Sequence, residues 1–417
     1  MVTKFAATRP VEGPWALPKG WRWERLGNVC RPTEKGSPAS RFTGSFRYTD
    51  VGGIGEGVEA KVVPVAEAPS RARQFVRPGD TLFSGVRVNL RRTILAKPEM
   101  TDVASTAFSV LSPGSEIEPA YLFRWMTSDF LVNSLIPLQR GSQPPAVLDD
   151  DVRAQPIAVP PPGIQRSIVA RIDELFAEID DGEAALALVR HDLETWRKAL
   201  LKAAVTGELT AHRRGHPKGR QNRRTRRFSE LVEIKSGFAF KSAEYGQGSI
   251  PLIRIADVAG DEVRVSGANA RMPDYHLRES ASFLVQNGDI LLTLSGSVGR
   301  SATYRSAEPA LLNQRVCRIR CRDDSGLLPD YAQLFLSAME QVIAAMGYGG
   351  SQANVSPKQI ADLPIVVPEE DEQLEILQCV DNHMAERDLA AATQALTETS
   401  KILRQSILAA AFRGELA

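Results

Sequence analysis

The chain has 417 residues, enough for two or three domains of ordinary size. Its composition, 43% hydrophobic and 24% charged, is that of a globular protein and excludes the disordered and fibrous classes. Its formal net charge is only +1, so a polyanionic partner would have to be bound by local basic patches.

The first 160 residues are dominated by short β-like runs at 46–51, 92–96 and 106–111, which are separated by glycine, proline and aspartate. We predict a mostly β domain there, with a helix over 121–136. A long helix is predicted next, between the stop at Pro160-Pro161-Pro162-Gly163 and Gly207. At roughly 43 residues and 1.5 Å per residue it would be about 64 Å long.

Apolar residues recur along this helix at the a and d positions of a heptad, which is a coiled-coil pattern. They are Ile168, Ile172, Leu175, Ile179, Gly182, Leu186, Val189, Leu193, Trp196, Leu200 and Ala203. Residues 211–227 follow with eight arginines and lysines and no acidic residue, which predicts a flexible basic tether. Phosphate contact by this tether and simple solvation remain equally open.

A second series of the same elements occupies the rest of the chain. The β-like runs lie at 250–258, 289–294 and 315–321, a helix is predicted over 331–346, and a second long helix over about 371–412. The second seam is weaker, because His383 and Arg387 interrupt it. We interpret His383 as a tolerated interface residue.

The two series are an internal repeat. Matching positions differ by 207 to 210 in residue number and keep their order along the chain. The matches are Val76-x-x-Gly79-Asp80-x-Leu82 with Val285-x-x-Gly288-Asp289-x-Leu291, Pro119-x-Tyr121 with Pro329-x-Tyr331, Gly141-Ser142-Gln143 with Gly350-Ser351-Gln352, Pro156-Ile157 with Pro364-Ile365, and Gly207-Glu208-Leu209 with Gly414-Glu415-Leu416. The fixed order favours duplication over chance recurrence of common turn fragments.

Each long helix needs a partner for its apolar stripe. We predict that the two helices pair, running antiparallel if a pseudo-twofold axis relates the units, with the β domains at opposite ends. The alternative is that each helix packs only on its own β domain.

Motifs of known chemistry are missing. The glycines at 52–57 have the wrong spacing for a dinucleotide site, no P-loop is present, and the pair His212 and His216 lacks the glutamate of a zinc helix. Glu233-Ile234-Lys235 has no upstream Pro-Asp to complete a nuclease pair. We therefore expect a protein that recognises a partner and binds no cofactor or metal itself.

The four cysteines, at 30, 317, 321 and 379, include no Cys-x-x-Cys pair, which argues against disulfides and a zinc ribbon. Cys317 and Cys321 fall on one face of a predicted strand. We interpret them as buried small hydrophobic residues, and a reactive thiol is the alternative. The start lacks the apolar stretch of a secretory signal, and no run approaches the ~18 apolar residues of a membrane span. We expect a cytoplasmic protein.

Candidate DNA-contacting residues lie in two kinds of loop. The segments after the Gly-Asp strands combine small residues with arginines, which suits phosphate or a guanine edge, and the Gly-Ser-Gln loops offer amides that can pair with adenine. Plain turns and caps are the competing reading. The candidates are Arg87, Asn89, Arg91, Arg140, Ser142, Gln143, Ser295, Ser297, Arg300, Ser351, Gln352 and Asn354.

Basic residues also bunch on either side of the Gly-Asp strands. They are Arg71, Arg73, Arg77, Arg87, Arg91 and Arg92 in the first unit, and Arg300, Arg305, Arg315, Arg318, Arg320 and Arg322 in the second.

The whole chain resembles the specificity subunits of type I restriction-modification enzymes. The resemblance rests on residues 17–27 (LPKGWRWERLG), on the Gly-Ser-Gln, Pro-Ile-x-Val-Pro and Gln-x-x-Ile passages of both halves, and on the helices that end in Gly-Glu-Leu. The chain departs from the family at Ile164-Gln165, where Glu-Gln is usual.

The resemblance implies an α+β fold in which two mostly β target recognition domains are separated by two long helices that form an antiparallel coiled coil. The domains would be 1–160 and 228–368, the helices 161–210 (central conserved region) and 369–417 (C-terminal conserved region), and the basic linker 211–227.

The implied function is non-catalytic recognition of an asymmetric bipartite site in double-stranded DNA. Two methyltransferase subunits would use S-adenosylmethionine to methylate a flipped adenine in each half-site, and restriction subunits would use ATP and Mg²⁺ for cleavage in phage defence. Two alternatives remain: a coiled-coil scaffold without sequence-specific DNA binding, and an unrecognised enzyme.

Overall fold

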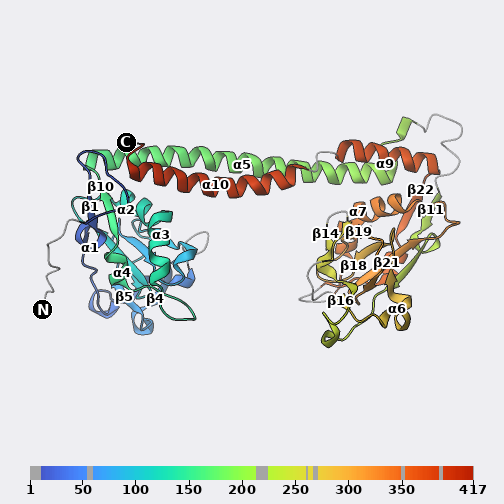
Figure 1. Cartoon of the computed structure of the whole chain (residues 1–417), viewed down its shortest axis with the longest axis horizontal. Helices are drawn as coiled ribbons and strands as arrows, with labels where there is room; N and C mark the ends of the chain where they lie inside the picture. The colour runs from blue at the N-terminus through green and yellow to red at the C-terminus, as the bar shows by residue number, and fades with distance from the viewer. Residues whose placement is uncertain are drawn as a thin grey trace. The chain divides into compact units, whose positions relative to one another are not determined.

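The computed structural model describes residues 11–53, 60–212, 224–259, 262–265, 271–348, 353–384 and 388–416 (Figure 1). The chain divides into two compact units. Unit 1 comprises residues 1–186 and 392–417, and unit 2 comprises residues 187–391. Each unit combines small sheets with helices, so the predicted α+β class is confirmed.

Unit 1 contains two four-stranded sheets, β2-β9-β6-β7 and β4-β3-β8-β5, and the pair β1-β10. The strands are β1 (Arg22–Arg25), β2 (Cys30–Arg31), β3 (Ser45–Thr49), β4 (Lys61–Pro64), β5 (Ala72–Phe75), β6 (Thr81–Ser84), β7 (Thr93–Leu95), β8 (Val103–Ser105), β9 (Phe108–Pro113) and β10 (Pro156–Val159). The helices are α1 (Leu26–Val29), α2 (Pro119–Met126), α3 (Asp129–Leu135), α4 (Asp149–Arg153) and the first part of α5 (Pro162–Thr206).

Unit 2 contains a six-stranded sheet, β12-β21-β18-β19-β15-β14, a four-stranded sheet, β16-β13-β20-β17, and the pair β11-β22. The strands are β11 (Arg224–Arg227), β12 (Val232–Ser236), β13 (Ile250–Ile253), β14 (Val258–Ala259), β15 (Glu262–Val263), β16 (Arg271–Met272), β17 (Leu284–Val285), β18 (Ile290–Thr293), β19 (Ser301–Thr303), β20 (Ala310–Leu312), β21 (Val316–Cys321) and β22 (Pro364–Val367). The helices are α6 (His276–Glu279), α7 (Pro329–Ala345), α8 (Pro357–Ala361) and α9 (Glu370–Met384), and α10 (Asp388–Arg413) follows.

The duplication is visible in the strand pairing. Strand β1 pairs antiparallel with β10 in unit 1, and β11 pairs in the same way with β22 in unit 2. The antiparallel trio β7-β6-β9 has its counterpart in β19-β18-β21. The Gly-Asp strands of the repeat are therefore the central strands β6 and β18 of these trios.

Three predictions about local structure are corrected. The helix predicted over 121–136 is two helices, because Ser128 is extended (ψ 148°) and its hydroxyl accepts the Leu131 N–H at the start of α3. The strand predicted over 250–258 ends at Ile253, and a 3₁₀ turn follows in which the Asp257 carboxylate accepts the Arg254 N–H. Residues 224–227 of the predicted tether form strand β11.

The long helix α5 begins at Pro162, where proline is compatible with the first helical turn, and ends before Gly207, whose φ of +76° favours glycine. Gly414 ends α10 in the same way at φ +83°. The second long helix is described as α9 and α10, because residues 385–387 lie outside the described residues.

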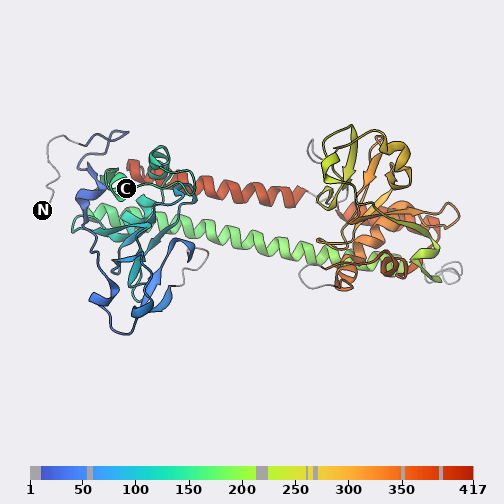
Figure 2. The ribbon, with the colours of Figure 1, turned by 90° about the horizontal axis from the view of Figure 1, so that it is seen from below.

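Each unit is completed by the ends of two long helices (Figures 1 and 2). In unit 1, Ile168 and Ile172 near the start of α5 share one core with Phe412 at the end of α10. In unit 2, Leu200 near the end of α5 shares a core with Ile376 of α9. Each β domain therefore packs against both the helix that follows it in sequence and a helix of the other repeat.

Contacts between long helices confirm the predicted pairing within each unit. In unit 1, the Arg404 guanidinium of α10 lies 2.7 Å from the Asp180 carboxylate and 3.1 Å from Glu183, both on α5. In unit 2, the Trp196 ring of α5 lies 6.3 Å from the His383 ring of α9. The predicted seam is buried at both ends of α5, whereas Val189 and Trp196 are exposed.

Candidate nucleic-acid interface

In unit 1, the loop after β6 lies against the Gly-Ser-Gln loop. The Arg140 N–H donates to the Ala146 carbonyl at 2.7 Å, and the Ala146 N–H donates back at 2.9 Å, so residues 140–146 form a hairpin. The Val147 N–H donates to the Gly85 carbonyl at 2.9 Å, and Val86 forms an isolated bridge with Ala146. The two loops predicted separately from the sequence therefore form one surface.

Unit 2 contains the same arrangement. Tyr348 and Asn354 exchange backbone hydrogen bonds of 3.0 and 2.9 Å, the Val355 N–H donates to Leu294 at 2.9 Å, and Ser295 forms a bridge with Asn354. We call residues 84–92 with 140–147 the recognition frame of unit 1, and residues 293–300 with Tyr348 and residues 353–355 the recognition frame of unit 2.

The candidates of unit 1 lie on this frame. Arg87, Asn89, Arg140, Ser142 and Gln143 are all exposed. The Arg87 backbone is left-handed at φ +50°, an unfavourable conformation for arginine, and its N–H donates to the Pro145 carbonyl at 2.9 Å. Contact with the neighbouring hairpin thus holds Arg87 on the frame.

Two unit 1 arginines on the frame have acidic partners. Arg91, also left-handed at φ +52°, forms an ion pair with Asp129 at the start of α3. The Arg140 guanidinium lies 3.2 Å from the Asp151 carboxylate but keeps 60% of its side-chain surface exposed. The Arg91 side chain is therefore held in an intramolecular ion pair, whereas the Arg140 side chain remains accessible to a ligand.

The candidates of unit 2 separate. Ser295 is buried, and its hydroxyl has no hydrogen-bond partner among the residues that the structure describes. The Ser297 carbonyl accepts a hydrogen bond from the Thr293 hydroxyl, which fixes the turn. Asn354 is exposed on the frame, and Ser351 and Gln352 lie outside the described residues.

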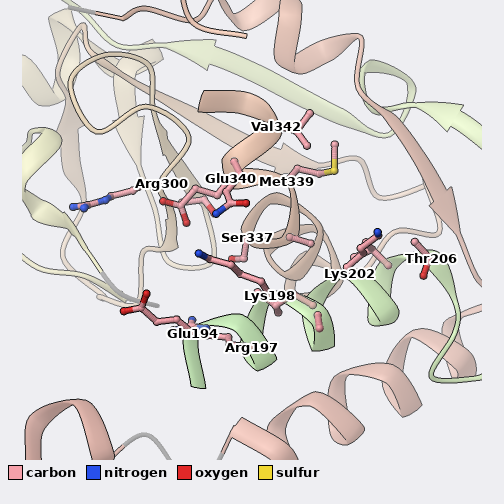
Figure 3. A pocket seen from close by; sticks show the side chains of 16 residues that line it. Glu194, Arg197, Lys198, Lys202, Thr206, Arg300, Ser337, Met339, Glu340 and Val342 are labelled. Atoms are coloured by element: carbon pink, nitrogen blue, oxygen red, sulfur yellow. The ribbon is translucent and has the colours of Figure 1, made fainter. Parts of the chain in front are cut away.

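Arg300 lines a groove of about 900 Å³ between α5 and α7 (Figure 3). Lys198 and Lys202 of α5 line the same groove, together with Glu194, Glu340 and apolar side chains that include Met339. Arg300 therefore lies beside helices α5 and α7, directly after the turn that contains Ser297.

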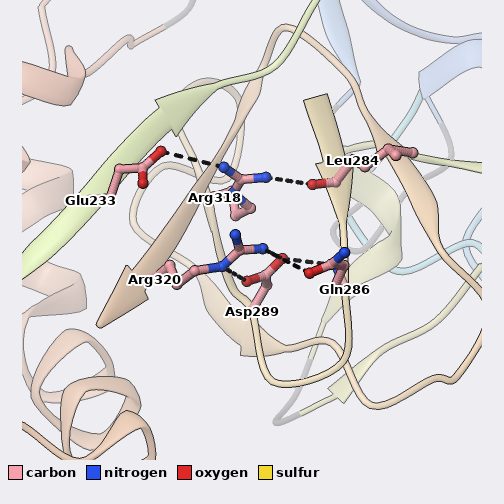
Figure 4. A network of polar contacts seen from close by, with 6 residues as sticks. All are labelled: Glu233, Leu284, Gln286, Asp289, Arg318 and Arg320. Carbon is pink, nitrogen blue, oxygen red and sulfur yellow. Dashed lines mark hydrogen bonds and ion pairs between the residues drawn. The ribbon is translucent and has the colours of Figure 1, made fainter. Parts of the chain in front are cut away.

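Several residues of the predicted basic patches have structural roles. Arg320 forms a two-point ion pair with Asp289, with both N–O distances 2.8 Å, and buried Arg318 donates to the Leu284 carbonyl and approaches Glu233 at 3.4 Å (Figure 4). Arg77 and Arg305 form ion pairs with Glu34 and Asp330. Fewer arginines of the predicted basic patches are therefore available to a ligand than their clustering in the sequence indicated.

Two accessible residues were missed as individual sites. Tyr348 and Arg315 are exposed, and neither side chain has a hydrogen bond or ion pair with any residue that the structure describes. The Leu294 N–H donates to the Arg315 carbonyl at 2.9 Å, so Arg315 adjoins the unit 2 frame. In the sequence, only the membership of Arg315 in the basic patch indicated that it could be a site residue. Nothing in the sequence singled out Tyr348.

The described residues hold no group of three or more histidine, cysteine or acidic side chains arranged to bind a metal. His212 lies 3.1 Å from the Glu375 carboxylate, and His216 is outside the described residues. No helix among the described residues is long and apolar enough to cross a membrane.

The cysteines differ in predicted reactivity. Burial raises the pKa of the Cys30 and Cys317 thiols to about 12 and that of Cys321 to about 11. We expect iodoacetamide at pH 8 to modify half-buried Cys379 before the other three, as measured by peptide mass spectrometry of the native protein. In urea, as a control, all four cysteines should react fully. Modification of Cys317 as fast as Cys379 in the native protein would contradict the predicted order.

Comparison with known proteins gives a consistent class. Residues 221–397 match the family model of the type I restriction modification DNA specificity domain. The chain is 28% identical over 317 residues to the type I restriction enzyme EcoKI specificity subunit of Escherichia coli K12, covering 74% of this chain and 68% of that protein. It is also 28% identical to the StySPI specificity subunit of Salmonella potsdam, over 73% of this chain and 67% of that protein.

Solved structures agree with this class. A chain of the type I R-M system, from work on its complex assembly and conformational transition, has a TM-score of 0.76 at 28% identity and covers 96% of this chain and 100% of its own length. The HsdS subunit from Thermoanaerobacter tengcongensis has a TM-score of 0.58 at 28% identity, over 96% and 99%. These matches confirm the resemblance to type I specificity subunits.

Proposed function

We propose that this chain is the sequence-specific DNA recognition subunit of a type I restriction-modification complex. Each unit reads one half of a bipartite target through its recognition frame, and the long helices set the spacing between the half-sites. The observation that carries the proposal is the recurrence of one backbone frame in both units with different exposed side chains, Arg140 in unit 1 and Tyr348 with Asn354 in unit 2.

Different side chains on equivalent frames favour an asymmetric target. An arginine suits a guanine edge, whereas an asparagine pairs with adenine. A symmetric homodimer would present the same residues twice and read a palindrome. A duplicated and diverged chain offers two different reading surfaces.

The chemistry belongs to partner subunits in this proposal. Two methyltransferase subunits dock on the chain and use S-adenosylmethionine, restriction subunits use ATP and Mg²⁺, and this chain binds none of these and performs no catalysis. The chain's contribution is to choose the DNA site at which the partners act.

The proposal is tested by expressing the chain with its cognate methyltransferase subunit in cells that lack adenine methylation. Single-molecule sequencing should then find methylated adenine in one gapped, asymmetric motif, and omission of this chain should abolish it. Binding of the purified complex to that motif should weaken steeply with salt.

Two results would contradict the proposal. Methylation in a contiguous palindrome would exclude two different reading units. A stable complex that binds no DNA at low salt would favour the coiled-coil scaffold instead.

A further inference from the structure

Matching backbone hydrogen bonds and bridges show which positions of the two recognition frames correspond. The mutual backbone pair is Arg140 with Ala146 in unit 1 and Tyr348 with Asn354 in unit 2. The bridge from the preceding loop is made by Val86 to Ala146 and by Ser295 to Asn354. Tyr348 is therefore the structural counterpart of Arg140.

Residues directly opposite each other in antiparallel bridges project their side chains to the same side, with Cβ atoms roughly 4.5–5.5 Å apart. Asn354 is bridged to both Ser295 and Tyr348, so the Tyr348 side chain projects on the same side as that of the candidate Asn354. Tyr348 is 61% exposed, and its ring makes no ring contact with any described residue.

We propose that Tyr348 contacts DNA and determines which base unit 2 accepts at one position of its half-site, as Arg140 does for unit 1. This inference rests on the proposed function and deepens it. An exposed tyrosine on a paired backbone loses little conformational freedom on binding, offers a face for stacking on a base or sugar, and carries a hydroxyl that can donate or accept.

The exchange of arginine for tyrosine between equivalent positions has a chemical consequence. The Arg140 guanidinium can donate two hydrogen bonds to guanine in the major groove, whereas a tyrosine ring favours contact with a base face or a thymine methyl group. One position on a shared frame would then contribute to the difference between the half-sites.

The first experiment measures DNA binding by the complex of this chain with its methyltransferase subunits. Tyr348→Ala should weaken binding to the wild-type motif roughly tenfold or more, in line with loss of one stacking contact. Tyr275→Ala, which removes another exposed tyrosine of unit 2 (47% exposed), is the matched control and should leave binding unchanged. Thermal unfolding of Tyr348→Ala should match that of the wild type, because the Tyr348 ring is at the surface. Tyr275→Ala also loses the contact with the His276 ring, 4.2 Å away, so both variants are compared well below their unfolding temperatures.

The second experiment maps the methylated motif. Tyr348→Arg should change the accepted base at one position of one half-site and leave the other half-site intact, while Arg140→Ala should relax only that other half-site. An unchanged motif and unchanged affinity for both Tyr348 variants would overturn the inference, as would equal weakening by Tyr275→Ala. Absence of any gapped motif for the wild type would instead refute the proposed function.

Discussion

Replacing Phe412 with alanine is expected to destabilise unit 1, although residue 412 lies close to the end of the chain and far in sequence from the β domain. The Phe412 side chain is 1% exposed, and its ring lies 4.7 Å from the Trp125 ring and 5.5 Å from the Tyr121 ring. Removing a buried phenylalanine costs about 3–5 kcal/mol of unfolding free energy, because the contacts are lost and the cavity does not fully collapse.

Tryptophan fluorescence measures the unfolding of unit 1 in particular. Four of the five tryptophans, at 15, 21, 23 and 125, belong to unit 1, so their emission during urea unfolding follows that unit. Ile402→Ala is the control, because Ile402 lies on the same helix and is 67% exposed. Equal unfolding midpoints for the two variants would show that the end of α10 does not complete the core of unit 1.

The long helices were predictable because their signals are local. The prolines before residue 163, the uninterrupted seam and Gly207 mark the ends of α5 within the sequence itself. The core that each helix end completes was not predictable, because an apolar stripe does not identify its partner. The end of α10 completes unit 1 through Phe412, a contact nearly 300 residues away from Tyr121 in sequence.

The internal repeat located the loops of the two recognition frames, but it did not predict which residues of the two loops correspond. Matching Gly141-Ser142-Gln143 with Gly350-Ser351-Gln352 shifts the two hairpins by one residue relative to their hydrogen bonds. The bonds pair 140 with 146 and 348 with 354, which makes Asn354 the counterpart of Ala146. A motif search finds residues that the two repeats share, so it misses positions such as 140 and 348, where the equivalent residues differ.

The roles of the arginines depend on neighbours that come from other strands. Arg320 and Arg315 are five residues apart and look alike in the sequence, yet Arg320 is paired with Asp289 across the sheet and Arg315 has no such pair among the described residues. Strand register therefore decides which arginine side chains remain available to a ligand.

The aspartates of the two Gly-Asp turns are expected to respond in opposite directions to the same substitution. Asp289 is buried, accepts the Gln286 N–H at 2.7 Å and forms the two-point ion pair with Arg320. Asp289→Asn leaves Arg320 without its counter-charge. Since the Arg320 side chain is 41% exposed, we expect a loss of about 2 kcal/mol, below the cost of breaking a fully buried pair.

The equivalent Asp80 accepts the Arg77 N–H at 2.9 Å, and Ser112 of β9 contributes a side-chain hydrogen bond. Burial is the largest influence on Asp80 and raises the pKa of its carboxyl group. A raised pKa in the folded state means that the contribution of Asp80 to stability is full below the unfolded value and is lost as the pH rises through the folded value. Asp80→Asn keeps an oxygen acceptor and removes this loss.

The two variants can therefore be compared by hydrogen exchange of unit-specific peptides at pH 7 and at pH 4. Asp80→Asn should leave the strands β6 and β9 as protected as in the wild type or more so, with the advantage larger at pH 7. Asp289→Asn should lower the protection of β18 and β21 at pH 7. Similar losses in both units would mean that the aspartates act only as turn acceptors, whereas opposite responses would show that the arginine of β21 converts a costly buried charge into a stabilising one.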